Sequence, residues 1–205
     1  MQLQRYLCGQ IRTDLSLPAV QRVGGVDVGY APKSKESIAS VAALSYPDLT
    51  LLESSVARLP TPFPYVPGLL SFREAPVILR ALESLTALPD LIFVDGHGRA
   101  HPRRLGIASH LGWWLRAPTI GIGKSRLCGE FKPTPSQKGK RVDLMHKDEL
   151  IGHVLCTRTG VRPIFVSVGY GLPLEECVRW TLLVTSRYRL PEPIRWAHRL
   201  ASNRV

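Results

Sequence analysis

The sequence predicts an α/β protein built on a mixed β-sheet with helices on both faces. Three strand-like stretches come first, and Pro47-Asp48 is a turn signal between the second and the third. Helical and strand-like segments then alternate, which adds parallel strands to an antiparallel meander. The expected strands cover residues 22–30, 38–46, 50–59, 91–95, 119–123, 149–158 and 164–168. The last two are expected at the sheet edge.

The remaining segments separate into helices and surface loops. Leu3, Leu7 and Ile11 recur at a four-residue spacing that suits a short amphipathic helix. Pro193 suits the first position of the last helix. The expected helices cover residues 1–14, 71–85, 105–115, 174–187 and 193–203. Proline-containing stretches at 60–68 and 133–140 should be loops. No repeat or linker divides residues 1–205, so one domain is expected.

Composition and charge narrow the class of protein. There are 27 Lys and Arg residues against 16 Asp and Glu, a net charge of +11 that favours a nucleic acid or another anionic partner. No apolar run approaches the ~20 residues of a membrane span, and the N-terminus lacks the apolar core of a signal peptide. The four cysteines form no Cys-x-x-Cys pair, so reduced thiols in a cytoplasmic protein are expected.

The segment 91–106, LIFVDGHGRAHPRRLG, has the character of an active-site strand and loop. Asp95 ends the apolar strand, and ligands of open α/β sheets bind at that end of the strands. His97, His101, Arg103 and Arg104 follow, which suits a polyanion. The alternative is an Asp-Gly turn in which Asp95 only accepts backbone hydrogen bonds, and it does not explain the histidines and arginines.

Three carboxylates predict a metal site. In the ribonuclease H arrangement of this element order, the first and fourth strands are neighbours, which places Asp27 beside Asp95. Glu74 shares the apolar face of the 71–85 helix. Buried unpaired carboxylates cost several kcal/mol, and a divalent cation would satisfy all three, with Mg²⁺ or Mn²⁺ favoured over zinc. Alternatively, Asp27 accepts turn hydrogen bonds, and Glu74 closes a capping box with Ser71 or precedes a helix that starts at Pro76.

Two further residues are candidates for the same site. His198 lies on an apolar face of the last helix, where it is either a core histidine or a metal-side group. Lys124 follows the 119–123 strand and would neutralise a phosphate or orient the attacking water. Otherwise, Lys124 is a surface lysine at a strand end.

Long motifs give a specific resemblance. The stretches VDVGY, PYVPGLLSFRE, LIFVDGHGRAHPRRLGIASHLG, PTIGIGKSRLCG and YRLPEPIRWAH resemble the endonuclease V family, in the same order and over almost the whole chain. The resemblance implies a ribonuclease H-like fold and a Mg²⁺-dependent repair endonuclease, with Mn²⁺ as a substitute. The resemblance also implies a substrate strand that contains deaminated purines, chiefly inosine. It implies cleavage at the second phosphodiester bond 3′ to the lesion, leaving 3′-hydroxyl and 5′-phosphate ends.

The resemblance also assigns residues. Asp27, Glu74 and Asp95 match the metal carboxylates, Lys124 the lysine near the scissile phosphate, and His198 a position that is histidine or aspartate. The residues expected to bind substrate are the wedge Pro64, Tyr65, Val66 and Pro67, the base-pocket residues Gly68, Leu70, Gly96 and Gly106, and the loop residues His101 and Arg103. Within this set, Tyr65 would fill the gap that a flipped base leaves.

Two other classes compete with this interpretation. Another nuclease of the ribonuclease H fold, such as an inosine-specific ribonuclease or a junction resolvase, would share the carboxylates, and a resolvase would not need PYVP. A catalytically silent nucleic-acid binder predicts the loss of at least one metal carboxylate, and all three are present. The family includes preferences for DNA and for RNA, so both substrates stay open. A monomer is expected.

Overall fold

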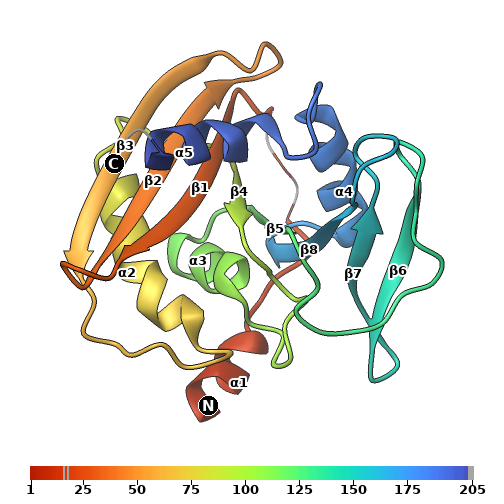
Figure 1. The fold of residues 1–205 in the computed structure, drawn as a ribbon, viewed down its shortest axis with the longest axis horizontal. Coiled ribbons are helices and arrows are strands. Elements are labelled where there is room, and N and C mark those ends of the chain that lie inside the picture. Colours follow the sequence, from red (N-terminus) through yellow and green to blue (C-terminus); the bar gives the residue numbers. More distant parts are fainter. Residues whose placement is uncertain (16, 18, 203–205) are drawn as a thin grey trace.

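The structure is a computed structural model that describes residues 1–15, 17 and 19–202. Its frame is an eight-stranded sheet in the order β3-β2-β1-β4-β5-β8-β7-β6 (Figure 1). The strands are β1 (Arg22–Ala31), β2 (Glu36–Ser45), β3 (Leu51–Pro60), β4 (Leu91–Asp95), β5 (Thr119–Gly123), β6 (Arg141–His146), β7 (Glu149–Leu155) and β8 (Ile164–Tyr170). The helices are α1 (Gln2–Cys8), α2 (Leu70–Leu82), α3 (Ile107–Leu115), α4 (Leu174–Leu183) and α5 (Glu192–Ser202).

The sheet is mixed, as the sequence predicts. Strands β1, β2 and β3 form the antiparallel meander, whereas β1, β4 and β5 run parallel to one another. Successive residues of β4 point to opposite faces. Ile92 and Val94 pack in the apolar cluster under α2 and α3, and Leu91 and Phe93 pack in the cluster that includes residues of α4 and α5. Helices therefore cover both faces, and the predicted fold class is confirmed.

The far end of the sheet differs from the prediction. The segments expected at the edge are β7 and β8, and both lie inside the sheet, because β6 forms the edge next to β7. Strand β6 was not predicted from the sequence. Only Leu144 of the six residues in β6 is fully buried. The strand therefore lacks the apolar pattern that identifies a strand in a sequence, as is common for edge strands.

Several helices also differ from their predicted bounds. Helix α1 ends at Cys8, and Leu3, expected on its apolar face, is 56% exposed. Helix α4 ends at Leu183 rather than near residue 187. Pro193 is the second residue of α5, and the predicted end at Asn203 lies outside the described residues. These differences lie at helix ends, where the bounds expected from the sequence pattern and those defined by backbone hydrogen bonds differ most.

Helix α2 resolves the alternatives for Glu74. It begins at Leu70, Leu69 makes no side-chain capping bond, and Pro76 lies inside the helix. A capping box with Ser71 and a helix start at Pro76 are therefore both wrong. Glu74 is a mid-helix residue.

A close approach of α5 to β1 brings the last helix to the site. A Cβ atom at Gly25 would lie 2.0 Å from the carbonyl oxygen of Pro193, so only glycine permits this packing. At Gly29 the corresponding position is open, with no backbone nearby. Among the described residues, no helix is long and apolar enough to cross a membrane.

Candidate active site

Asp27, Asp95 and His198 meet where the pairing of β1 with β4 ends. Val26 pairs with Val94 in the parallel register, so the next residues, Asp27 and Asp95, lie side by side. Helix α5 adds His198, whose Nε2 lies 2.7 Å from Asp95 Oδ2 and 3.6 Å from Asp27 Oδ1. One ligand atom from each residue falls within 4.8 Å of the others. Two carboxylates and an imidazole at this spacing fit a divalent metal ion.

Lys124 extends this cluster from the end of β5. Its Nζ lies 2.5 Å from Asp95 Oδ2 and 2.8 Å from His198 Nε2. The backbone carbonyl of Lys124 accepts a 2.6 Å hydrogen bond from Arg189 Nη2. Arg189 was not predicted as a site residue, because its role depends on the chain between α4 and α5 folding back onto β5.

Glu74 lies close to the cluster but outside the group of three. It comes from α2 and shares a pocket with Asp95. Burial raises its pKa to about 7; nearby Arg73 lowers it, and Asp27 and Asp95 raise it further. Glu74 is thus a buried carboxyl that gains from a cation beside it, as a metal-site carboxylate would.

The two aspartates have pKa values shifted in opposite directions. Burial raises the pKa of Asp27, and its attraction to His198 offsets only part of this effect. Burial also opposes the ionisation of Asp95, but hydrogen bonds from His198 and Lys124 outweigh it and hold the pKa of Asp95 below its usual value. Asp95 is therefore the more readily ionised carboxyl of the pair.

A cavity of about 170 Å³ opens beside Asp95 and Glu74. Six of the predicted substrate-binding residues line it: Tyr65, Gly68, Leu70, Gly96, His101 and Gly106. The other four, Pro64, Val66, Pro67 and Arg103, are not among its lining residues. Five further members of the wall were not predicted to bind the base, namely Ser71, His97, Leu105, Ile107 and Leu127, although His97 was placed in the active-site loop. Most of these are apolar or small residues, which carry no signal of a binding role in a sequence.

The pocket depends on glycine where the backbone turns back on itself. A Cβ atom at Gly106 would lie 2.2 Å from the carbonyl oxygen of His97. Gly96 has a φ of +156°, and a Cβ there would meet Ile107 Cγ2 at 2.5 Å. Both positions therefore exclude larger residues, and the backbone itself forms part of the pocket wall.

The basic loop contacts the protein rather than solvent. Arg104 donates to Glu149 Oε2 at 2.7 Å and to the His146 carbonyl at 3.0 Å, which ties the loop to the β6–β7 hairpin. Arg103 donates to the Gly68 carbonyl at 2.7 Å. Arg103 and Arg104 were expected to contact a polyanion, whereas both have partners within the protein.

His101 is buried in the same loop. Its Nδ1 accepts a 3.1 Å hydrogen bond from the Arg103 backbone N–H. Burial, reinforced by the charge of Arg103, lowers the pKa of His101 to about 4. The ring is neutral at physiological pH, so it contributes hydrogen bonds to the pocket rather than positive charge.

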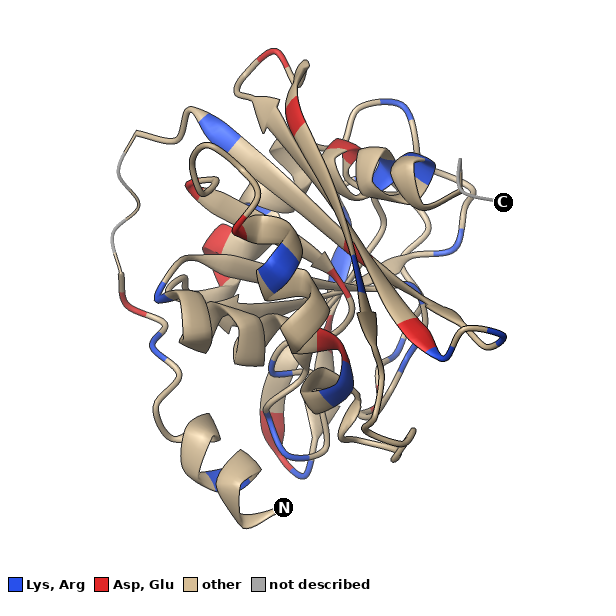
Figure 2. Cartoon of the chain, turned by 90° about the vertical axis from the view of Figure 1, so that its left-hand side faces the viewer, with Lys and Arg blue, Asp and Glu red and all other residues tan. Residues whose placement is uncertain are grey.

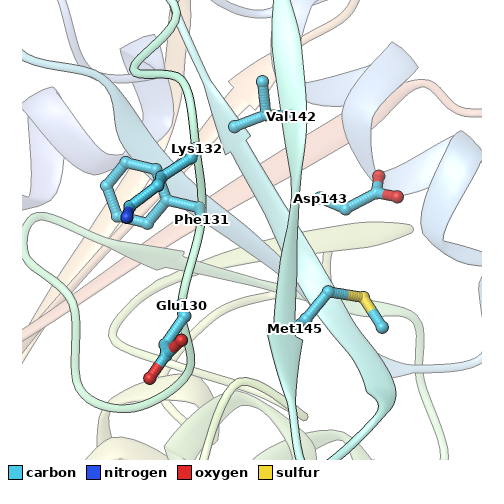
Figure 3. A pocket seen from close by; sticks show the side chains of 6 residues that line it. All are labelled: Glu130, Phe131, Lys132, Val142, Asp143 and Met145. Atoms are coloured by element: carbon cyan, nitrogen blue, oxygen red, sulfur yellow. The ribbon is translucent and has the colours of Figure 1, made fainter.

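Elsewhere, a surface depression of about 570 Å³ lies beside the edge strand β6 (Figure 3). Residues of the 130–132 segment and of β6 line it, and none of them belongs to the Asp27–Asp95–His198 cluster. Lys and Arg residues are spread over helices, strands and loops (Figure 2). Because the depression includes no residue of the Asp27–Asp95–His198 cluster, the pocket beside Asp95 is the candidate active site.

Known proteins are similar to this chain over most of its length. The family model for endonuclease V matches residues 5–199. The chain belongs to the endonuclease V family. An endonuclease V from Trichormus variabilis is 50% identical over 203 residues, which cover 98% of this chain and 92% of the relative. The resemblance predicted from the five sequence motifs is confirmed.

Solved endonuclease V structures have the same fold. The enzyme from Streptomyces avermitilis matches with a TM-score of 0.93 and 38% identity, covering 98% of this chain and 90% of that one. Endonuclease V from Ciona intestinalis matches with a TM-score of 0.86 and 28% identity, covering 98% and 94%. The Ciona protein was solved in complex with a 24mer DNA that contains an inosine followed by a ribo-adenosine.

Proposed function

We propose that this chain is a Mg²⁺-dependent repair endonuclease that recognises inosine in DNA. It hydrolyses the second phosphodiester bond on the 3′ side of the lesion and leaves a 5′-phosphate. The observation that carries the proposal is the cavity beside Asp95 and Glu74, which places a base-sized recess against the carboxylate cluster. The inosine-containing DNA bound to the Ciona relative supports the same substrate.

The proposed metal site consists of Asp27, Asp95 and Glu74, with His198 beside them. The hard carboxylate oxygens suit Mg²⁺, and Mn²⁺ is the expected substitute. When bound, such an ion activates a water molecule and stabilises the leaving oxygen of a phosphodiester. Burial raises the pKa of the Glu74 carboxyl to about 7, so this group gains from a neighbouring cation.

The protein's own residues have separate proposed roles at the scissile phosphate. Lys124, 40% exposed at its side chain and held beside Asp95, presents a positive charge to the phosphate. His198 Nε2 lies 2.7 Å from Asp95 Oδ2, so it orients the carboxylate that also contacts Lys124 Nζ. The Arg189 contact to the Lys124 carbonyl fixes the backbone from which the lysine extends.

The proposed lesion recognition uses the wedge and the pocket. Tyr65 is 65% exposed within the proline-framed loop and also lines the cavity. A rigid exposed aromatic ring can fill the gap in a base stack with little loss of entropy. Unstacking a base costs a few kcal/mol and less at a weak pair, which itself favours inosine. The pocket then receives the flipped base.

The alternative is an inosine-specific ribonuclease with the same residues. We propose that the enzyme acts as a monomer in the cytoplasm.

Matched DNA and RNA strands, each with one inosine, test the substrate with purified protein and Mg²⁺. Faster cleavage of the DNA strand supports the proposal, faster cleavage of the RNA strand favours the ribonuclease, and cleavage of neither strand overturns both.

A further inference from the structure

Gln4, a residue of α1 outside the predicted site, bridges two walls of the base pocket. It is 1% exposed, and its Nε2 donates to the Gly68 carbonyl at 3.0 Å and to the Leu105 carbonyl at 2.9 Å. Gly68 ends the loop that carries Tyr65, and Leu105 precedes Gly106; these residues line the pocket. One side-chain amide therefore fixes the distance between the wedge loop and the loop that leads into α3.

Arg103 completes the bridge. Its Nε donates to Gln4 Oε1 and its Nη2 donates to the Gly68 carbonyl at 2.7 Å. A Cβ atom at Gly68 would lie 2.4 Å from Arg103 Nη2, so the arginine packs directly against that backbone. Gln4 and Arg103 thus satisfy each other and share the Gly68 carbonyl, and the loss of Gln4 would leave the Leu105 carbonyl and Arg103 Nε without this partner.

The bridge also affects which base the pocket accepts. Hypoxanthine presents a carbonyl acceptor where adenine presents an amino donor, so a free carbonyl in the wall would favour adenine. Gln4 donates to the carbonyls of Gly68 and Leu105, and Arg103 donates to that of Gly68, so both carbonyls already have partners within the protein. Sites that discriminate by hydrogen bonds can reject the wrong group by several orders of magnitude.

We infer that Gln4 is a positioning residue for inosine selectivity: it fixes the two pocket walls and keeps their carbonyls occupied. This role rests on the proposed inosine-directed activity. Gln4 lies outside the carboxylate cluster, so it acts on the base and not on bond cleavage. Its loss should therefore raise KM and reduce discrimination, with little effect on kcat.

The test compares Gln4→Leu with a matched control, Gln10→Leu. Gln10 belongs to the same N-terminal segment, but its Oε1 accepts a 2.8 Å hydrogen bond from Trp113 Nε1, away from the pocket. With inosine and adenosine strands that differ only at that one base, Gln4→Leu should raise KM for the inosine strand at least about tenfold. It should also lower the inosine-to-adenosine ratio of kcat/KM at least about tenfold, with kcat within about threefold. Gln10→Leu should leave the ratio unchanged, even if it lowers the melting temperature.

A second variant covers the case in which Gln4→Leu does not fold. Gln4→Glu keeps the size and the acceptor for Arg103 but loses both N–H donors, so it should show the same fall in the ratio. An unchanged ratio in either folded variant, with a wild-type enzyme that discriminates, overturns the role of Gln4. A wild-type enzyme that does not discriminate overturns the proposed function instead.

Discussion

His198 and Asp95 lie 103 residues apart in the sequence, and their Nε2 and Oδ2 atoms are 2.7 Å apart. The contact joins the last helix to the central strand β4 and brings Lys124 and Asp27 into the same cluster. Lys124 and His198 both contact Asp95, and His198 also lies 3.6 Å from Asp27. Asp95 is therefore the centre of the proposed catalytic site.

Asp95→Asn should abolish cleavage while leaving binding of the inosine strand within about tenfold, because it removes a metal ligand and not the contacts to base and phosphate. Cleavage and filter-binding assays of the same preparation measure both quantities. Asp148→Asn, in the β6–β7 turn, is a control that should cleave normally. Full activity from folded Asp95→Asn would remove the basis for the metal-site assignment.

Metal removal should stop the reaction reversibly. EDTA should end turnover, and Mg²⁺ or Mn²⁺ should restore it, because both are expected to suit a compact site of carboxylate oxygens. Ca²⁺, which prefers more ligands at longer distances, should bind without restoring the rate. Activity in EDTA, or restoration by Ca²⁺ alone, would contradict the proposed site.

Glu74 should make the metal-free protein less stable as the pH rises. Its pKa is about 7 in the folded protein, against about 4.3 in an unfolded chain. Between these values the folded state binds the proton more tightly, so its stability is greatest at the acid end and falls towards pH 7, by at most about 4 kcal/mol. Glu74→Gln should lack this loss.

Melting temperatures in EDTA between pH 4.5 and 7.5 measure the effect. The wild-type melting temperature should fall relative to that of Glu74→Gln across the window, since all other titrating groups are common to both proteins. Added Mg²⁺ should reduce the difference by compensating the ionised carboxylate. Parallel melting curves in EDTA would show that Glu74 ionises normally and has no special environment.

Tyr65→Ala should weaken binding of inosine strands by roughly 5- to 150-fold, because stacking on an aromatic ring contributes about 1–3 kcal/mol per base. Tyr65→Phe keeps the ring and should bind like the wild type. Affinities for inosine-containing and undamaged strands are the quantities to compare. An equal loss on both strands would make Tyr65 a general contact rather than a wedge.

The sequence predicted the parts of the site that depend on topology. The meander followed by alternating helices and strands placed β1 next to β4, and that neighbourhood alone brings Asp27 beside Asp95. The residues of the pocket wall were predicted where a glycine or a residue-by-residue match to the family marked them. Leu105, Ile107 and Leu127 were missed because apolar residues look the same in a core and in a pocket.

Charged and polar residues were harder to place. Arg103 and Arg104 look like phosphate ligands in the sequence, but Gln4, Gly68 and Glu149 engage them within the protein. Such partners lie far away in the chain, and residue type does not reveal them. Strand β6 was missed for a related reason: its alternating polar residues follow from its place at the sheet edge, which only the fold determines.

The most direct test of the central claim maps the cut on two strands that differ only in one base, inosine or adenosine. With Mg²⁺, the wild-type enzyme should nick the inosine strand one nucleotide beyond the lesion, with a 5′-phosphate on the downstream product. It should leave the adenosine strand almost intact, because the proposed pocket hydrogen-bonds a carbonyl and rejects an amino group. Comparable cleavage of both strands, or cuts scattered along the inosine strand, would contradict an inosine-directed endonuclease.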